Sequence, residues 1–277
     1  MKNTINCKGR VIDLSTPKVM GILNVTPDSF HDGGRYTDIQ DAIKQAEKML
    51  IAGASIIDIG GQSTRPGAEE VGEQEEINRT IPIIQALVKQ FSDIIISIDT
   101  YRATVAKAAI NAGASIINDV SAGDDDVDMF NTVAALQVPY IIMHKQGNPQ
   151  TMQQNPEYNN VVKEVVDYFV TKTTQLKNLG VHDVIIDPGF GFGKTVEHNY
   201  SLLKHLGVFN VFNVPVAGGS RKSMINKVLG TKPENALNGT TAVNTMALLN
   251  GAKILRVHDV KEAMQVLKLY EAYITAP

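Results

Sequence analysis

One stretch sets the pattern of this chain: Ser55-Ile56-Ile57-Asp58-Ile59-Gly60-Gly61-Gln62-Ser63-Thr64-Arg65-Pro66-Gly67, an apolar run that turns at once into glycines and polar side chains. The same layout recurs every few tens of residues. Each of these apolar runs is strand-like. The eight runs occupy residues 19–23, 55–59, 94–98, 115–117, 140–143, 184–186, 214–217 and 254–255.

Helical patterns fill the intervals between these runs. Ile39 to Ala52 carries apolar residues at helical spacing, with Thr37 or Asp38 as the expected N-cap and Gly53 as the stop. Similar patterns occupy 73–91, 102–112, 127–136, 158–179, 196–206, 222–229, 240–249 and 260–273. Eight strands that alternate with helices and end in polar residues are typical of an α/β fold, the (β/α)₈ TIM barrel, whose active site lies at the carboxyl ends of the strands.

The length of 277 residues fits one barrel domain. We expect residues 18–277 to form this domain, and residues 1–17 to be a lead-in that could form a short hairpin. Sequence repeats of the solenoid type and low-complexity linkers are both missing from the chain.

Composition excludes several classes of protein. The net charge is -3 with no long run of one sign, which argues against a nucleic-acid or membrane-surface protein. Cys7 is the only cysteine, so a cysteine-rich zinc site and an intramolecular disulfide are excluded. The first residues have no apolar leader, and no stretch approaches the ~20 apolar residues of a membrane span. We therefore expect a cytoplasmic protein.

Two loops that follow adjacent strands concentrate functional residue types. They span residues 24–34 and 60–67, and both are rich in glycine, proline and polar side chains. A third segment, Asp187 to Thr195, ends in Gly-Lys-Thr like a phosphate-binding P-loop. That loop needs glycine six residues before its lysine, and here Pro188 occupies the position. We therefore reject a nucleotide P-loop.

These segments, together with Ser220-Arg221-Lys222 and Arg256-Val257-His258, closely resemble the dihydropteroate synthase family of the folate pathway. The resemblance runs in order from about Lys18 to the C-terminus. It implies a TIM-barrel transferase that joins 6-hydroxymethyl-7,8-dihydropterin pyrophosphate to p-aminobenzoate. It also implies Mg²⁺, a homodimer and an enzyme of a family that sulfonamides target.

The resemblance assigns the site residues to two pockets and a metal. Asn24 resembles the Mg²⁺ contact, and Arg65 would help to stabilise the departing pyrophosphate. The residues implied for the pterin and its pyrophosphate are Asp99, Asn118, Met143, Asp187, Lys222, Arg256 and His258. Those implied for p-aminobenzoate are Phe30, Thr64, Pro66, Phe192 and Ser223. The catalytic set is Asp99, Lys222, Arg256, His258 and Arg65.

The residue chemistry suits this assignment. A pterin edge needs rigid donors and acceptors, which Asp187, Asn118 and Lys222 provide, and a guanidinium such as Arg256 can stack on the ring and reach phosphate. The expected reaction is a dissociative displacement at the pterin methylene carbon. Since the aniline nitrogen is already nucleophilic, no strong general base is required, which agrees with the absence of a Ser-His-Asp pattern.

Several residues keep open alternatives. Asp58 lies inside its strand and favours a buried hydrogen-bonding role, and Asp119 favours a loop or helix cap. His31, Gln62 and Lys145 depart from residues frequent in the family, and His144 could merely support the floor of the pocket. Two other functions remain: a pterin-dependent methyltransferase with the same barrel, and a non-catalytic pterin-binding paralogue.

Overall fold

The computed structural model describes residues 3–25, 35–62, 71–147, 152, 156–212 and 215–277. The strands in these ranges are β1 (Thr4–Cys7), β2 (Arg10–Asp13), β3 (Lys18–Asn24), β4 (Ile56–Gly60), β5 (Ile96–Asp99), β6 (Ile116–Asp119), β7 (Tyr140–Met143), β8 (Val184–Asp187), β9 (Val216–Ala217) and β10 (Ile254–Val257). The α-helices are α1 (Arg35–Ala52), α2 (Glu73–Gln90), α3 (Ala103–Ala112), α4 (Met129–Leu136), α5 (Val161–Asn178), α6 (Val196–Lys204), α7 (Ser223–Leu229), α8 (Leu237–Leu249) and α9 (Val260–Thr275). Two 3₁₀ helices, η2 (Leu206–Phe212) and η3 (Pro233–Asn235), complete the described elements. None of the helices in this part of the chain is long and apolar enough to cross a membrane.

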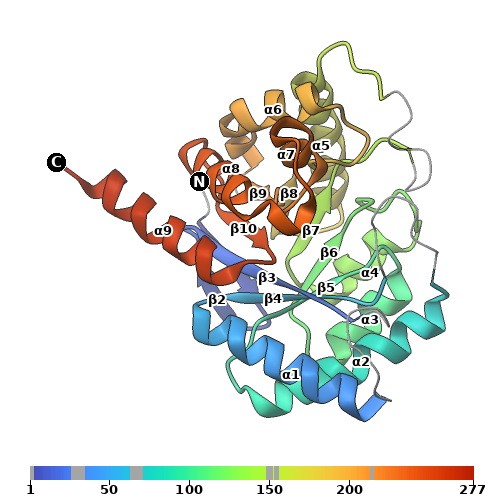
Figure 1. Cartoon of the computed structure of the whole chain (residues 1–277). Coiled ribbons are helices and arrows are strands. Elements are labelled where there is room, and N and C mark those ends of the chain that lie inside the picture. The colour runs from blue at the N-terminus through green and yellow to red at the C-terminus, as the bar shows by residue number, and fades with distance from the viewer. Residues whose placement is uncertain (1–2, 26–34, 63–70, 148–151, 153–155, 213–214) are drawn as a thin grey trace.

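Eight strands form a parallel barrel, as the sequence predicts. Their order is β8-β7-β6-β5-β4-β3-β10-β9. A parallel bridge between Ile186 and Pro215 joins β8 to the residue before β9 and closes the ring. Figure 1 shows the helices arranged around these strands. Because every strand runs the same way, all the polar strand ends predicted from the sequence meet at one mouth.

Side chains alternate between two cores along each strand. In β4, Ile57 and Ile59 face the helices and belong to the large outer core, whereas Ile56 faces the barrel interior. This alternation follows from the two-residue period of a strand. The deepest interior layer is apolar, and every strand or its first flanking residue contributes to it: Met20, Ile56, Ile95, Ile116, Ile141, Ile185, Val216 and Ile254.

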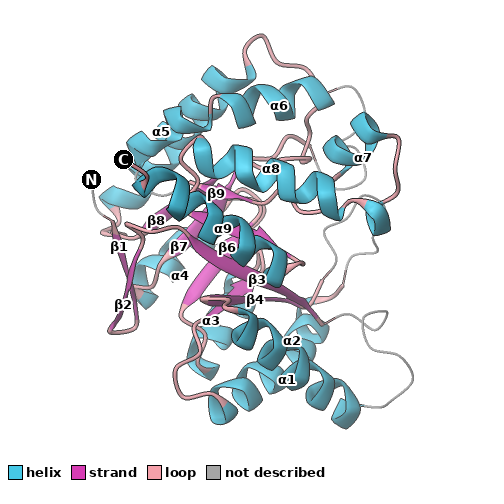
Figure 2. Cartoon of the chain, turned by 60° about the vertical axis from the view of Figure 1, so that its left-hand side comes forward, coloured by secondary structure: helices cyan, strands magenta, loops and turns pink. Residues whose placement is uncertain are grey.

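The N-terminal lead-in covers the amino end of this barrel. Strands β1 and β2 form an antiparallel hairpin, which confirms the hairpin expected in residues 1–17. Its turn is made by Lys8 and Gly9, with φ of 56° and 90°, the left-handed conformation that tight hairpin turns require. Ile5, Cys7 and Leu14 pack against the apolar interior layer. Figure 2 shows the hairpin at the opposite end of the barrel from α7.

One helix start differs from the sequence prediction. Helix α1 begins at Arg35 rather than Ile39, so Thr37 and Asp38 lie inside the helix and the predicted N-cap is wrong. Apolar periodicity marks where a helix touches the core, and it cannot mark a polar first turn. The predicted stop is confirmed, because Gly53 has φ of 107° and its N–H donates to the carbonyl of Leu50.

The hairpin should stabilise the barrel without taking part in its chemistry. Leu14 is fully buried against the interior layer. We expect Leu14→Ala to lower the free energy of unfolding by ~2–5 kcal/mol, as for other large-to-small core changes. Val11→Ala, at an exposed position on the same hairpin, should stay within about 0.5 kcal/mol of wild type. Urea denaturation measures both, and an equal effect of the two changes would contradict the packing role.

Candidate functional site

One pleat above the apolar layer, the barrel interior becomes polar. The two-residue period that points Ile56 inward also points Asp58 inward, and the same step applies on the other strands. The interior positions at this level include Asp58, Ser97, Asn118, Met143, Asp187 and Arg256. The next step up reaches Asn24, Gly60, Asp99 and His258 at the mouth. The barrel therefore brings together residues that are far apart in the sequence.

Arg256 forms the centre of this polar layer. Its Nε donates to Asp58 Oδ2 at 2.7 Å, and its Nη2 donates to Asp99 Oδ2 at 2.5 Å. Burial opposes the charge of the guanidinium, but the carboxylates of Asp58 and Asp99 outweigh burial and raise the pKa of Arg256. Arg256 therefore remains charged inside the barrel. Its guanidinium, which comes from β10, is held by carboxylates of β4 and β5, the two strands beyond β3.

Asp58 positions Asn118 as well as Arg256. Its side chain is fully buried, and Oδ2 also accepts from Asn118 Nδ2 at 3.1 Å. This contact sets the orientation of the Asn118 amide, because a carboxylate can only accept hydrogen bonds and the NH₂ group of the amide is its only donor. The buried hydrogen-bonding role predicted for Asp58 is confirmed. Asp58 Oδ1 and Ser97 Oγ, its inward neighbour on β5, have no hydrogen-bond partner among the described residues.

Asp99 and Asn24 converge above Gly60. A Cβ on Gly60 would lie 3.5 Å from Asp99 Cβ and 3.7 Å from Asn24 Oδ1, so glycine leaves the space between them open. Burial raises the pKa of Asp99 to about 7 against the pull of Arg256, and the carboxylate of Asp58 adds to the rise.

Asn24 is a candidate ligand for a hard cation. Its amide oxygen lies at the mouth and is of the type that Mg²⁺ accepts together with substrate phosphates and water. In the described part of the chain, no group of three or more His, Cys, Asp or Glu could hold a metal by itself. The residues present therefore fit a Mg²⁺ that is held jointly by Asn24 and an anionic substrate.

Asp187 presents a fixed carboxylate at the end of β8. Its Oδ1 accepts from the backbone N–H of Gly189 at 2.7 Å, and the residue is 6% exposed. Its Oδ2 lies over Gly218, where a Cβ would approach to 3.2 Å. Any side chain at Gly218 would therefore be in tight contact with this carboxylate. Met143 pairs with Asp187 across the β7–β8 ladder, so both interior side chains belong to one wall.

Lys222 and Phe192, which the resemblance assigns to different pockets, lie next to each other. The ring of Phe192 lies 4.6 Å from Lys222 Nζ, and Nζ also donates to the carbonyl of Phe190. Burial lowers the pKa of Lys222 to about 8, although Asp187 opposes this shift. Phe190 itself is buried in the outer core. Of the two aromatic residues in this loop, Phe192 is therefore the one available to line a pocket.

Arg221 ties the loop that carries Lys222 to the end of β10. Its guanidinium donates to both carboxylate oxygens of Asp259, at 2.9 and 2.7 Å. The N–H of His258 donates to Ser220 Oγ at 3.3 Å. The sequence alone does not indicate this link, because its two halves lie on separate segments. Ser223, predicted for the second pocket, is exposed at the start of α7.

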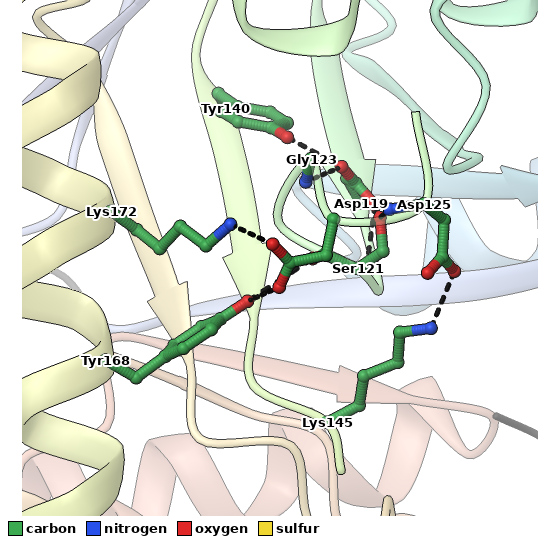
Figure 3. Close-up of polar contacts among 9 residues, drawn as sticks. Asp119, Ser121, Gly123, Asp125, Tyr140, Lys145, Tyr168 and Lys172 are labelled. Carbon is green, nitrogen blue, oxygen red and sulfur yellow. Dashed lines mark hydrogen bonds and ion pairs between the residues drawn. The ribbon is translucent and has the colours of Figure 1, made fainter. Parts of the chain in front are cut away.

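The loop after β6 is closed by a network around Asp119 (Figure 3). Its carboxylate accepts from the N–H and the hydroxyl of Ser121, both at 2.7 Å, from the N–H of Gly123 at 2.8 Å and from the hydroxyl of Tyr140 at 2.6 Å. The predicted capping role of Asp119 is confirmed. Lys145 lies over the same loop and binds Asp125 at 2.6 Å. This network fixes the turn that follows Asn118.

A buried lysine lies behind the Asp187 wall and was not identified from the sequence. Lys194 Nζ is 3.0 Å from His144 Nδ1 and 3.1 Å from the carbonyl oxygen of His144. The rings of Tyr158 and Tyr168 flank His144. Burial and the charge of Lys194 lower the pKa of His144 from 6.5 to about 3, so the imidazole is neutral at physiological pH.

Five predicted positions lie outside the described residues. They belong to the two loops at 24–34 and 60–67: Phe30, His31, Thr64, Arg65 and Pro66. Gln62, at the described base of the second loop, accepts from Arg102 Nη1 at 3.0 Å.

Comparison with known proteins places this chain in a family. A family model described as pterin binding enzyme matches residues 20–258. The dihydropteroate synthase of Escherichia coli K12 is 45% identical over 272 residues, which cover 97% of this chain and 96% of that protein. The Yersinia pestis dihydropteroate synthase, solved with a sulfonamide drug complex, has a TM-score of 0.93 and 41% identity over 99% of this chain and all of that one. The Xanthomonas albilineans enzyme with 4-aminobenzoic acid has a TM-score of 0.93 and 39% identity over the full length of both chains.

The shared carboxylate of Asp58 generates a first prediction for this site. Asp58→Asn keeps an amide oxygen but removes the negative charge that pairs with Arg256, and breaking a buried ion pair costs about 3–5 kcal/mol. We expect this loss of unfolding free energy in urea denaturation. Asp41→Asn, on the surface of α1, is the matched control and should lie within about 0.5 kcal/mol of wild type. A wild-type stability for Asp58→Asn would refute the ion pair.

The neutral state of His144 generates a second prediction. Between pH 6.5 and about 3, the unfolded chain binds a proton at His144 that the folded chain does not bind. The free energy of unfolding therefore falls as the pH is lowered through this window, by up to about 1.4 kcal/mol per pH unit from this group. His144→Gln should show a smaller loss over the same window, and the exposed His205→Gln should keep the wild-type dependence. Parallel curves for wild type and His144→Gln would contradict the assignment.

Proposed function

The chain belongs to the family of pterin-binding enzymes and has the activity of its dihydropteroate synthase members, and from this premise we propose how its residues divide the work. The reaction joins 6-hydroxymethyl-7,8-dihydropterin pyrophosphate to p-aminobenzoate and releases pyrophosphate. The observation that carries the proposal is the layer of fixed polar groups at the mouth. Asp187, Asn118 and Arg256 occupy interior positions of the barrel, and the charges of Asp187 and Arg256 act on Lys222 beside them.

We propose that the pterin ring lies across this layer. Asp187 accepts from the ring N–H and the exocyclic amine, since its carboxylate is held by Gly189 and can present its second oxygen. Asn118 reads the adjacent edge with an amide whose nitrogen is already turned to Asp58. Lys222 donates to the carbonyl side, and Met143 contributes an apolar surface. Groups held by their own neighbours need little reorganisation when the substrate binds.

The departing pyrophosphate is the main electrostatic demand of the reaction. Arg256 lies on β10 and His258 directly follows this strand, which pairs with β3, the strand that ends at Asn24. We propose that these side chains, with Arg65 of the second loop, bind the phosphate oxygens. Asn24 would hold Mg²⁺ there, and the bound ion would supply further positive charge to the leaving group. Asp99 keeps Arg256 in position. Its carboxylate would also stabilise the positive charge that develops at the pterin methylene carbon.

The p-aminobenzoate pocket would lie beside Phe192 and Ser223, with Phe30, Thr64 and Pro66 as its remaining wall. Phe192 stands next to Lys222, so the second substrate would enter next to the pterin carbonyl side. The aniline nitrogen attacks the methylene carbon as a neutral amine, and its proton can leave to water. This site therefore needs orientation rather than a strong base.

We also propose a homodimer formed through adjacent helices of the shell. Helices α7, α8 and α9 pack in sequence on one side of the barrel, and the end of α9 projects beyond the body of the molecule (Figure 1). Exposed apolar side chains occupy all three helices: Val228, Leu229, Met246, Leu249, Leu269, Tyr273 and Ile274. A second copy would remove this surface from water. Sedimentation tests the proposal, and a monomer at micromolar concentration would refute it.

We place the enzyme in the cytoplasm, because its pyrophosphate substrate is highly charged and does not cross a membrane unaided. Fractionation of cells that produce the protein tests this location, and recovery with the membranes would contradict it.

The direct test of function incubates the pure protein with the dihydropterin pyrophosphate, p-aminobenzoate and Mg²⁺, and measures dihydropteroate. EDTA should stop the reaction, and excess Mg²⁺ should restore it. Product formation that is insensitive to EDTA would remove the metal from the proposal. Failure to form dihydropteroate under all conditions would refute the function.

Asp187 generates the sharpest prediction for pterin recognition. Asp187→Asn presents an N–H group to ring donors and leaves them unpaired, which costs ~1–3 kcal/mol and more for a charge-assisted pair. We expect pterin affinity to fall by at least about tenfold in calorimetry, which is the lower part of that range. Asp167→Asn on the surface of α5 should bind like wild type. Unchanged affinity in Asp187→Asn would exclude Asp187 from the pocket.

A further inference from the structure

Lys194 is a buried basic residue to which the reaction assigns no task. Only 3% of the residue is exposed, and within the described ranges its Nζ forms no salt bridge. An ammonium group in such a place is costly unless every N–H finds an acceptor. A buried lysine of this kind indicates that its hydrogen bonds are needed, because an apolar side chain could not form them.

Three acceptors surround Lys194 Nζ. The carbonyl oxygen of Phe192 lies at 3.0 Å, that of His144 at 3.1 Å, and His144 Nδ1 at 3.0 Å. Burial lowers the pKa of Lys194 to about 7, with Asp187 opposing the shift and Lys222 adding to it. The ammonium form fills all three acceptors. The amine form can still donate to both carbonyls and accept from Nδ1–H, because the neutral imidazole of His144 can exchange tautomers.

The contacts of Lys194 join two loops that touch through their backbones. A Cβ on Gly189 would lie 1.9 Å from the carbonyl oxygen of His144, and one on Gly193 would lie 2.4 Å from that of Gln146. Both glycines have positive φ, 74° and 65°. The segment from Asp187 to Thr195 therefore packs closely against the residues that follow β7, and the hydrogen bonds of Lys194 hold it there.

The same segment also carries groups that contact Lys222 and Asp187. The carbonyl of Phe190 accepts from Lys222 Nζ, and the ring of Phe192 lies 4.6 Å from that Nζ. The N–H of Gly189 donates to Asp187 Oδ1. A shift of this segment would therefore move the acceptor of Lys222, the wall beside it and the donor to Asp187 together.

We propose that Lys194 is a positioning residue for both substrate pockets, which holds the Asp187–Thr195 segment against His144 and thereby sets the places of Lys222 and Phe192. This inference rests on the proposed roles of Asp187, Lys222 and Phe192. Since both charge states of Lys194 keep its three contacts, the segment stays fastened on either side of neutral pH.

Lys194→Met tests the inference in the full-length enzyme, because it keeps the length of the side chain and removes the N–H donors. We expect the Kd for the pterin and the KM for p-aminobenzoate to rise by about tenfold or more, since small displacements of positioned groups have effects of this size. Lys204→Met is the control, because Lys204 is exposed in the last turn of α6, outside the segment. It should keep the wild-type constants.

A double-variant cycle separates positioning from simple loss of stability. If Lys194 acts through Lys222, then Lys194→Met adds little to the loss of pterin affinity in Lys222→Met, whereas independent effects would multiply. A lowered Tm with unchanged Kd and KM would overturn the proposal, as would multiplicative effects in the cycle. If Lys194→Met does not fold, Lys194→Gln, which keeps two N–H donors, is compared in its place. A wild-type enzyme without synthase activity would instead refute the proposed function.

Discussion

A guanidinium inside a barrel is stable only if carboxylates accompany it, and Arg256 meets this condition through Asp58 and Asp99. The remaining arrangement of the mouth depends on this cluster. The same oxygen of Asp58 also accepts from Asn118. One buried carboxylate therefore positions both the charged side chain of Arg256 and the neutral amide of Asn118. Asp99 bridges the cluster to the space beside Asn24, where the leaving group would lie.

The cluster is possible because one end of the barrel interior is apolar and closed, whereas the other end is polar. Below the polar layer, one apolar residue from each strand position fills the interior, and the β1–β2 hairpin closes that end with Ile5, Cys7 and Leu14. Water cannot reach the ion pairs from beneath, which strengthens each contact and makes each missing partner costly. Stability therefore resides at the amino end of the strands and chemistry at the carboxyl end, as in other barrels of this kind.

Close backbone approach is the second constraint on the site. Gly189 and Gly193 lie where a side chain would collide with the backbone of His144 or Gln146, and a Cβ on Gly218 would be in tight contact with Asp187, at 3.2 Å from its Oδ2. These glycines allow the β8 and β9 ends to converge, so that Asp187, Phe192 and Lys222 form one wall. Lys194 and Arg221 then fasten the segments from behind, each with contacts to a neighbouring strand end.

The sequence by itself determined the barrel, the location of the mouth and most residues on it, because strand period and polar strand ends are local properties that repeat along the chain. It also indicated the hairpin and the buried role of Asp58. It misplaced the start of α1, whose polar first turn has no apolar periodicity. Only the tertiary structure decided which side chains meet: Asp58 and Arg256 are 198 residues apart, and Lys194 and His144 are 50 apart. Such pairs leave no pattern in the sequence, because closure of the barrel, rather than any local preference, brings their strands together.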